Sequence, residues 1–312
     1  MKNIAIIGAG QLGSRHLQAL AKVKENITLY IVDPSEQSLK TSQDRFYEVN
    51  DLNKKLICTQ SINALPKEIE FVVISTNSKQ RLGVLKELIA HARVKYLLLE
   101  KFLFPLIDEY EEASTILQSV STKVYVNCTR RMWTSYQHLK LQLDNKEQIT
   151  FNVSGVNWNL ASNSIHFLDV FLYLVDENYA DIDHSSLDNE IVENKRPGYI
   201  EFTGTLKAVT PKGHQLILTS DISGVEPINI TVTSNNKHYK IYETEQRMLE
   251  NDEEKAFEIY HQSNLTNKVY EQLQQRGSCS LVDYAASANE HLLLLNAFNS
   301  FLGARAREGA IT

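Results

Sequence analysis

The sequence predicts an α/β protein, in which a doubly wound parallel sheet is followed by a second, α+β domain built on an open, mainly antiparallel sheet. Three observations support this prediction. The first 33 residues read as a strand, a glycine turn, a helix and a parallel strand. Strands and helices then alternate as far as Asn127, which favours parallel pairing through right-handed crossovers. Beyond residue 198, strands follow one another with turn signals between them.

The glycine turn, residues 8–13, lies between the apolar runs 4–7 and 27–32. Gly8 permits the turn, Gly10 lets the backbone approach a pyrophosphate, and Gly13 lets the helix pack close to the strand. The pyrophosphate would bind at the helix N-terminus, where unpaired N–H groups and the helix dipole favour an anion. The turn therefore predicts a dinucleotide-binding site.

Asp33 ends the second strand, about twenty residues after Gly13, where a carboxylate can accept hydrogen bonds from ribose hydroxyls. Such a carboxylate would repel a 2′-phosphate, and no arginine follows within residues 34–36. The sequence therefore favours NAD over NADP as the cofactor.

The remaining elements of the first domain follow from apolar runs and helical periodicity. We expect helices over 35–49, 79–92 and 106–119, and strands over 55–62, 70–75, 94–99 and 124–127. Ligands of such sheets bind at the carboxyl ends of the strands. One crevice is therefore expected to collect the glycine turn, Asp33, Ser75-Thr76-Asn77, Glu100-Lys101 and residues 127–131.

The pattern changes after about Arg130, and we place the domain boundary there. Residues 1–128 are predicted to bind the dinucleotide, and residues 129–312 to bind substrate and to form the oligomer. The second part should contain a strand at 149–153, a helix over 163–174, antiparallel strands over 199–209, 215–222, 228–233 and 238–242, and helices over 265–275 and 282–302.

Composition excludes several classes of protein. The chain has 312 residues, of which 43% are hydrophobic and 22% are charged, and its net charge of −6 includes no basic block. Nothing therefore predicts a nucleic-acid or anionic-membrane partner. No apolar run approaches the roughly 20 residues that span a bilayer, and the N-terminus is not a signal peptide. Cys58, Cys128 and Cys279 form no metal-binding pattern, so we expect no metal and reduced, buried thiols in a cytoplasmic protein.

Four motifs together resemble one family. They are the glycine turn, Ser75-Thr76-Asn77, Glu100-Lys101, and a later helix that carries His166 and Asp169. The chain resembles the Gfo/Idh/MocA-type sugar oxidoreductases, the glucose–fructose oxidoreductase and inositol dehydrogenase family. This resemblance implies a Rossmann domain followed by an α+β domain, a homodimer or homotetramer formed through the open sheet, and oxidation or reduction at CH–OH groups with NAD(P).

The resemblance also assigns roles to residues. Lys101 matches the family's lysine that contacts nicotinamide and substrate, and His166 matches its proton-relay histidine. Two positions depart from the family, because Phe102 replaces a proline and Ser162 stands where an acid often precedes the histidine by one helical turn. We predict Lys101 and His166 as the catalytic residues. The predicted cofactor-binding residues are Gly8, Gly10, Gln11, Leu12, Gly13, Asp33, Ser75, Thr76, Asn77, Glu100 and Lys101.

Each of these side chains also has a structural interpretation. Lys101 could be an ordinary solvated charge at a strand end, and His166 a core histidine among apolar neighbours. Arg130 and Arg131 could bind a carboxylate or phosphate of the substrate in a forked geometry, or could be a surface pair at the domain junction. The predicted substrate-site residues are Arg130, Arg131, Trp158, Asn163 and Asp169, the last placed to orient His166.

The leading hypothesis is an NAD(H)-dependent oxidoreductase that transfers a hydride between nicotinamide and a carbohydrate or sugar derivative. The two arginines favour an acidic or nucleotide-linked sugar, held between the nicotinamide and the open sheet. A non-catalytic dinucleotide-binding regulator or sensor of the same fold is the alternative from another class, kept open by Phe102 and Ser162. An imine or other non-sugar reductase is the third hypothesis.

Overall fold

The computed structural model describes residues 2–52, 54–194, 197–224, 228–305 and 311. The chain forms two compact units, the first from Met1–Asn127 and Tyr260–Ala285, the second from Cys128–Ile259 and Ala286–Thr312. The first crossing between units lies one residue from the predicted boundary. Residues 260–285, which the sequence analysis placed in the second domain, lie in the first unit. Tyr270 of this segment is buried there, with its ring 5.9 Å from that of Phe71.

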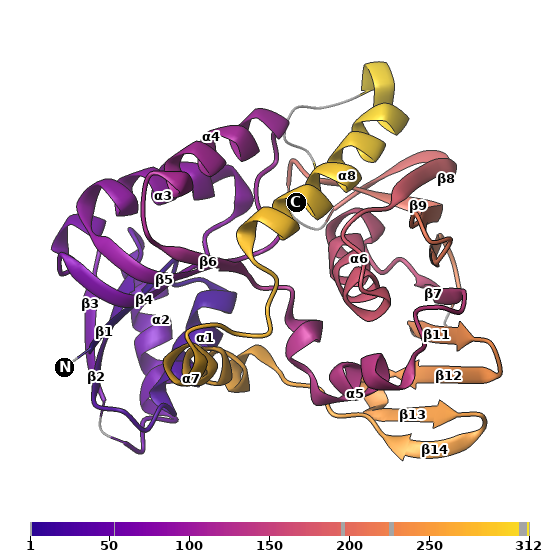
Figure 1. Cartoon of the computed structure of the whole chain (residues 1–312). Helices are drawn as coiled ribbons and strands as arrows, with labels where there is room; N and C mark the ends of the chain where they lie inside the picture. Colours follow the sequence, from indigo (N-terminus) through magenta and orange to yellow (C-terminus); the bar gives the residue numbers. More distant parts are fainter. Residues whose placement is uncertain (1, 53, 195–196, 225–227, 306–310, 312) are drawn as a thin grey trace. The chain divides into compact units, whose positions relative to one another are not determined.

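The first unit is a six-stranded parallel sheet in the order β3-β2-β1-β4-β5-β6. Its strands are β1 (Lys2–Ile7), β2 (Ile27–Val32), β3 (Lys55–Thr59), β4 (Glu68–Ile74), β5 (Arg93–Leu99) and β6 (Lys123–Val126). Its helices are α1 (Gln11–Ala21), α2 (Glu36–Tyr47), α3 (Ser78–His91), α4 (Ile107–Gln118) and α7 (Thr266–Arg276). Helices α1, α2 and α7 lie on one side of the sheet, and α3 and α4 on the other (Figure 1).

Local chemistry explains these elements. Strands β1, β4 and β5 are apolar and almost fully buried in their last four residues, as expected for a sheet covered on both faces. The side chains of Ser35 and Asn77 accept backbone hydrogen bonds and so begin α2 and α3. Strand β3 ends before the predicted residue 62, because Ser61 caps a 3₁₀ turn over Ile62–Ala64. The Rossmann topology predicted from the sequence is confirmed.

The second unit is an eight-stranded sheet in the order β14-β13-β12-β11-β7-β10-β9-β8. Its strands are β7 (Ile149–Val156), β8 (Asp181–Glu193), β9 (Ile200–Val209), β10 (Gln215–Asp221), β11 (Asn229–Ser234), β12 (Lys237–Tyr242), β13 (Arg247–Glu250) and β14 (Glu253–Ala256). Its helices are α5 (Thr134–Gln142), α6 (Leu160–Val175) and most of α8 (Tyr284–Leu302). Within this second sheet, the pairing of β7 with β10 is parallel and the other pairings between described strands are antiparallel. The predicted mainly antiparallel sheet is therefore confirmed.

The strand order and several elements of the second domain were not predicted. Strand β7 lies between β10 and β11 and pairs with both. The sequence reasoning missed α5, β8, β13 and β14. Strand β8 is mostly exposed and irregularly paired at the sheet edge, and β14 is fully exposed, so neither has the apolar alternation that marks a strand.

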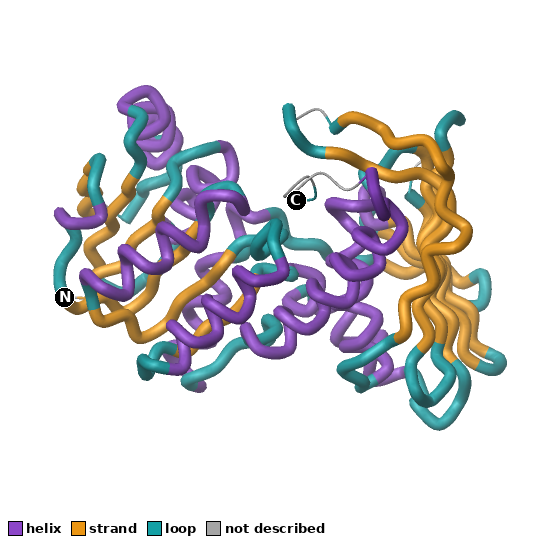
Figure 2. Tube along the Cα trace, turned by 90° about the horizontal axis from the view of Figure 1, so that it is seen from above, coloured by secondary structure: helices purple, strands orange, loops and turns teal. Residues whose placement is uncertain are grey.

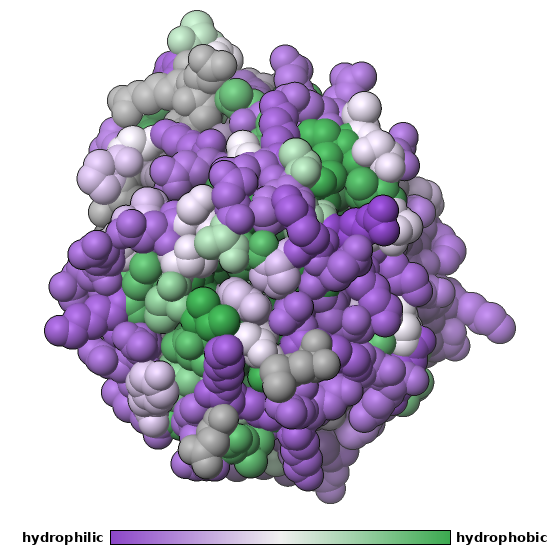
Figure 3. Space-filling view, turned by 90° about the vertical axis from the view of Figure 1, so that its left-hand side faces the viewer, coloured by the Kyte–Doolittle hydropathy of each residue, from purple (hydrophilic) through white to green (hydrophobic). Residues whose placement is uncertain are grey.

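The sheet of the second unit is covered on one side by helices, and its other side carries only strands and loops in the described residues (Figure 2). Helix α6 supplies the central part of this cover, with twelve buried residues out of sixteen. The face of the molecule drawn in Figure 3 is largely hydrophilic, with apolar side chains in separate patches.

The cysteine prediction holds only in part. All three cysteines are free thiols, but only Cys128 is buried, whereas Cys58 and Cys279 are partly exposed. Among the described helices, none combines the length and apolar character needed to cross a bilayer. The described residues also contain no group of three or more His, Cys, Asp or Glu side chains that could hold a metal ion.

Candidate functional site

The glycine turn joins β1 to α1 at the carboxyl end of the first unit's sheet. Gly8 has a φ of +101°, and a Cβ on Gly13 would lie only 1.8 Å from the Gly8 carbonyl oxygen. Both positions therefore require glycine for the packing of α1 against the turn. Gly10 differs, because a Cβ there would meet no atom within 4 Å. The space beside Gly10 at the N-terminus of α1 fits an approaching pyrophosphate.

The side chain of Asp33, which is predicted to bind the cofactor, is held in place by two backbone N–H groups. Its Oδ2 accepts the Ala9 N–H at 2.8 Å, and its Oδ1 accepts the Ser35 N–H at 2.8 Å. The carboxylate is thus tied to the glycine turn on one side and to the start of α2 on the other. Each oxygen keeps further lone pairs, so a ribose hydroxyl could still donate to it.

Other residues predicted to bind cofactor shape the same edge of the sheet. Ser75 donates its hydroxyl to the Gly8 carbonyl at 2.8 Å, and Asn77 caps α3 by accepting the Gln80 N–H at 3.1 Å. Gln11 is exposed at the start of α1, and Leu12 beside it is 39% exposed although it is apolar. An exposed leucine in this position could cover a bound dinucleotide.

A buried polar network holds the end of β5, immediately before Lys101. Glu100 is 3% exposed, and its Oε1 accepts hydrogen bonds from His16 Nε2 at 2.8 Å and from Asn127 Nδ2. The network continues from His16 Nδ1 to the Thr266 hydroxyl, at 2.8 Å. It therefore joins α1, β5, β6 and α7 within one unit. The sequence analysis did not single out His16 and did not find this network.

Lys101 is partly buried at the end of β5, and the peptide bond that joins it to Phe102 is cis. A fully buried arginine fixes the loop that follows. Arg81 of α3 donates to the carbonyl oxygens of Phe102, Leu103 and Thr76. The loop after β4 is thereby tied to the residues that directly follow Lys101. This arginine was also missed, because nothing in its sequence neighbourhood distinguishes it from a surface residue of α3.

In the second unit, His166 lies on α6 and is partly exposed. Asp169, one turn further on, is fully buried and accepts the Arg131 Nε–H at 2.9 Å. Arg131 also binds Glu290 at 3.0 Å. Burial raises the pKa of the Asp169 carboxyl, opposed by the charge and hydrogen bond of Arg131. Asp169 therefore has a structural partner in Arg131, and its predicted role in orienting His166 stays a prediction.

The two arginines predicted to bind substrate already hold carboxylates of their own unit. Arg130 donates from Nε and Nη2 to Glu243, at 2.7 and 2.6 Å, and its guanidinium lies over the Phe167 ring. Arg131 is engaged by Asp169 and Glu290, as above. The forked geometry expected for a substrate anion is thus used within the protein, and the predicted role of these residues in binding an acidic sugar stays a prediction.

Trp158 and Asn163 are likewise engaged in local contacts. The Trp158 indole N–H donates to the Thr219 carbonyl at 2.8 Å, and its ring packs edge-on against Phe167. Asn163 donates to the Trp158 carbonyl at 2.8 Å. Their predicted place in a sugar pocket stays a prediction, and these hydrogen bonds and the ring contact hold both side chains without a ligand.

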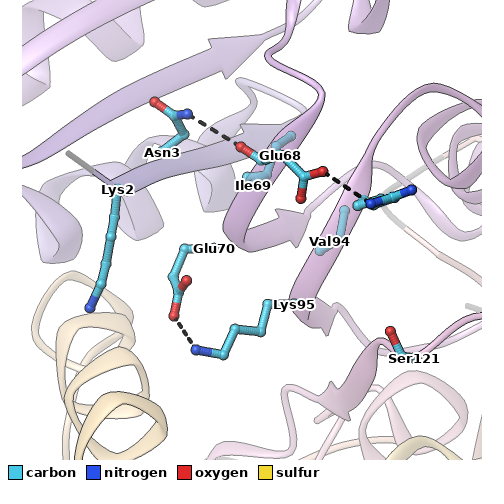
Figure 4. A pocket seen from close by; sticks show the side chains of 9 residues that line it. Lys2, Asn3, Glu68, Ile69, Glu70, Val94, Lys95 and Ser121 are labelled. Carbon is cyan, nitrogen blue, oxygen red and sulfur yellow. Dashed lines mark hydrogen bonds and ion pairs between the residues drawn. The ribbon is translucent and has the colours of Figure 1, made fainter.

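A separate cavity of about 430 Å³ lies at the opposite edge of the first unit's sheet (Figure 4). It is lined by the first residues of β1, β4 and β5, where Glu70 pairs with Lys95 at 2.8 Å. Ligands of doubly wound sheets bind at the other edge, beyond the carboxyl ends of the strands. We therefore assign no role in the reaction to this cavity.

Comparison with known proteins agrees with this geometry. Residues 2–128 match a family profile described as an oxidoreductase family with an NAD-binding Rossmann fold, GFO_IDH_MocA. The first unit therefore matches the NAD-binding Rossmann domain of the Gfo/Idh/MocA oxidoreductases. No curated protein matches the chain in a sequence comparison. The match covers the glycine turn, Asp33 and the Glu100-Lys101 pair.

Solved structures extend the likeness over nearly the whole chain. An Agrobacterium radiobacter oxidoreductase in complex with NAD⁺, L-tartaric acid and magnesium is 14% identical, with a TM-score of 0.70 over 99% of this chain and 98% of its own. UDP-N-acetylglucosamine 3-dehydrogenase GnnA from Acidithiobacillus ferrooxidans is 13% identical, with a TM-score of 0.68 over 95% and 96%. The transcriptional regulator Gal80p from Kluyveromyces lactis is 14% identical, with a TM-score of 0.71 over 99% and 94%. At these identities the likeness establishes the fold.

Proposed function

We propose that this protein is an NAD(H)-dependent dehydrogenase or reductase of a carbohydrate or sugar derivative. The observation that carries the cofactor choice is the Asp33 carboxylate, fixed at the end of β2 by the Ala9 and Ser35 N–H groups. A 2′-phosphate brought to this point would meet a negative charge, whereas ribose hydroxyls would meet an acceptor. We therefore assign NAD rather than NADP.

The chemistry proposed is exchange between a secondary alcohol and a carbonyl. Bound NAD supplies the hydride acceptor or donor, and the protein supplies orientation and electrostatics. In oxidation, the hydride leaves the sugar carbon as the hydroxyl proton passes to a protein base. We assign Lys101 to polarise the oxygen at the reacting carbon and His166 to proton transfer. The partial burial of both side chains is compatible with these roles.

The sugar class rests on the family resemblance. Among proteins of this fold, GnnA acts on a nucleotide-linked sugar, and on that analogy UDP-sugars are the first candidates to test. Assembly as a dimer or tetramer through the open side of the second unit's sheet is part of the same proposal. The alternative is a regulator that binds the dinucleotide without turnover, and the similar fold of Gal80p favours keeping it.

The test is a panel of UDP-sugars, inositols and aldoses incubated with NAD⁺, with NADH formation followed by absorbance at its nicotinamide band. Wild-type protein should turn over one class, and Lys101→Met should bind NADH with nearly unchanged affinity while losing turnover. Turnover by Lys101→Met at the wild-type rate would refute the role of Lys101. NADH binding without turnover across the panel would favour the regulator.

A further inference from the structure

A buried carboxylate from β9 lies against the first turn of α6. Glu201 is 3% exposed, and its Oε2 accepts the Ser162 N–H at 3.2 Å. Its Oε1 accepts the Ser162 hydroxyl and, at 2.7 Å, the Asn194 amide N–H. In the described part of the chain, all these hydrogen-bond donors are neutral, so Glu201 is a buried acid held without an ion pair.

One role of Glu201 is to begin the helix. Asn159, which precedes α6, has a φ of +61° and makes no side-chain capping bond. The Glu201 carboxylate accepts a first-turn N–H in its place and lies at the positive end of the helix dipole. Capping alone would require only one acceptor oxygen, and it would not require access to solvent.

Glu201 also reaches a cavity. A hollow of about 450 Å³ in the second unit is lined by Glu201 and Thr203 of β9, by Asn157 and Asn159, and by Glu190 and Glu193 of β8. The acid is therefore buried from bulk solvent yet borders a space large enough for water or a small hydroxylated group.

The same turn of α6 leads to His166. In the first two turns of this helix, Ser162, Asn163 and His166 are the residues that are only partly buried. Ser162 and His166 are four residues apart, so their side chains are neighbours on the same partly buried face of α6. The Glu201 carboxylate thus binds α6 one helical turn before His166, the proposed proton-transfer residue.

We propose that Glu201 is a positioning residue for His166, supplying from β9 a negative charge that stabilises the protonated imidazole. This inference rests on the proposed function, because it gives His166 a purpose in proton transfer. Residue 162 is a serine, and its hydroxyl contacts the carboxylate of Glu201, which lies 39 residues further along the chain. The sequence around His166 contains no sign of this acid, since the contact is tertiary.

Two opposing effects act on the Glu201 carboxyl. Burial raises its pKa, and the hydrogen bonds from Ser162 and Asn194 oppose that rise and favour the charged form. The charged groups around α6 include Glu190 and Glu193 of β8, Asp169 of α6, and Arg130, whose guanidinium lies over the Phe167 ring. Strands β8 and β9 also carry Asp181, Asp183, Asp188 and Lys207. Asp169 shares Arg131 with Glu290, whereas Glu201 binds the turn of α6 that precedes His166, so Glu201 is the acid to test first.

The experiment is an NMR titration of the protein labelled with ¹³C and ¹⁵N in its histidines, with His166→Gln used to assign the His166 signals. Glu201→Gln retains an acceptor and a donor at the helix start but removes the charge. We expect the pKa of His166 to fall by roughly half a pH unit or more in this variant. Adding Ser162→Asp to Glu201→Gln should raise it again, because the acid returns to the same turn of α6.

Glu190→Gln is the matched control, since it removes another carboxylate that lines the same cavity. It should leave the His166 titration unchanged. An unchanged His166 pKa in folded Glu201→Gln would overturn the proposal and leave Glu201 as a helix cap. If Glu201→Gln fails to fold, Ser162→Asp alone decides, because an added acid that leaves the His166 pKa unchanged would also overturn it. The titration uses neither cofactor nor substrate, so its result is independent of whether NADH binds.

Discussion

Substitution by alanine should affect two glycines of the same turn differently: Gly13→Ala should lose stability, and Gly10→Ala should lose NADH affinity. In Gly13→Ala, the new Cβ would start 1.8 Å from the Gly8 carbonyl oxygen, and real Cβ contacts are not found below 3.0 Å. The clashing atom belongs to the backbone of the turn after β1, so no side chain can rotate away. Because overpacking at adaptable sites already costs about 1–3 kcal/mol, we expect a loss of about 3 kcal/mol or more. The melting temperature should fall by roughly 6–12 °C.

In Gly10→Ala, the added methyl meets no protein atom within 4 Å, and the φ of −67° suits alanine. The free energy of unfolding should stay within about 0.5 kcal/mol of wild type. The methyl would instead occupy the space assigned to the pyrophosphate. We expect NADH to bind at least about tenfold more weakly, a loss of about 1.4 kcal/mol.

The assays are thermal unfolding by circular dichroism and calorimetric titration with NADH. Gly83→Ala serves as the control, because Gly83 lies exposed in α3 with no atom near its Cβ position. It should preserve both stability and NADH affinity. Wild-type NADH affinity in Gly10→Ala would refute the assignment of the pyrophosphate site, and wild-type stability in Gly13→Ala would refute the close packing of α1 on the turn.

Three further predictions concern buried or catalytic groups. His16→Leu leaves the Glu100 carboxylate without one of its donors, and should destabilise the protein by about 2–4 kcal/mol in urea unfolding; an unchanged unfolding midpoint would contradict the network. Burial lowers the pKa of His214, whose Nδ1 accepts the Ile149 N–H at 3.1 Å. Its folded-state pKa therefore lies below that of the unfolded chain, so stability should fall as pH drops below about 6.5, and His214→Gln should lose less stability between pH 7 and 5; equal losses would exclude His214 as the cause. Lys101→Arg keeps the charge but changes the donor geometry, and should reduce kcat at least tenfold with little change in NADH affinity, measured once a substrate is found; an unchanged kcat would show that charge alone suffices.

The first unit could be predicted from sequence because its signals are local. Buried parallel strands such as Phe71–Ile74 are continuous apolar runs, and helix starts carry capping residues such as Asn77. The glycine turn and Asp33 lie within one βαβ unit, so their spacing is readable along the chain. The return of residues 260–285 to this unit was not readable, because it depends on tertiary contacts such as that of Tyr270 with Phe71.

The polar groups that support the site were missed for a related reason. His16 binds Glu100 across 84 residues of sequence, and Glu201 binds Ser162 across 39. Arg81 looks like a surface residue of a helix until its three carbonyl partners are seen. The arginines at 130 and 131 were predicted to bind a substrate anion, and in the structure carboxylates of the same unit contact both. Their part in substrate binding stays a prediction.

The central claim is a cofactor site that selects NAD through Asp33, and calorimetric titration of wild-type protein with NADH and then NADPH tests it most directly. We predict that NADH binds and that NADPH binds at least about tenfold more weakly, a difference of about 1.4 kcal/mol. Asp33→Ser should narrow this difference by removing the charge that repels the 2′-phosphate. Binding of NADPH as tight as that of NADH would contradict the role of Asp33, and binding of neither nucleotide would contradict the cofactor site itself.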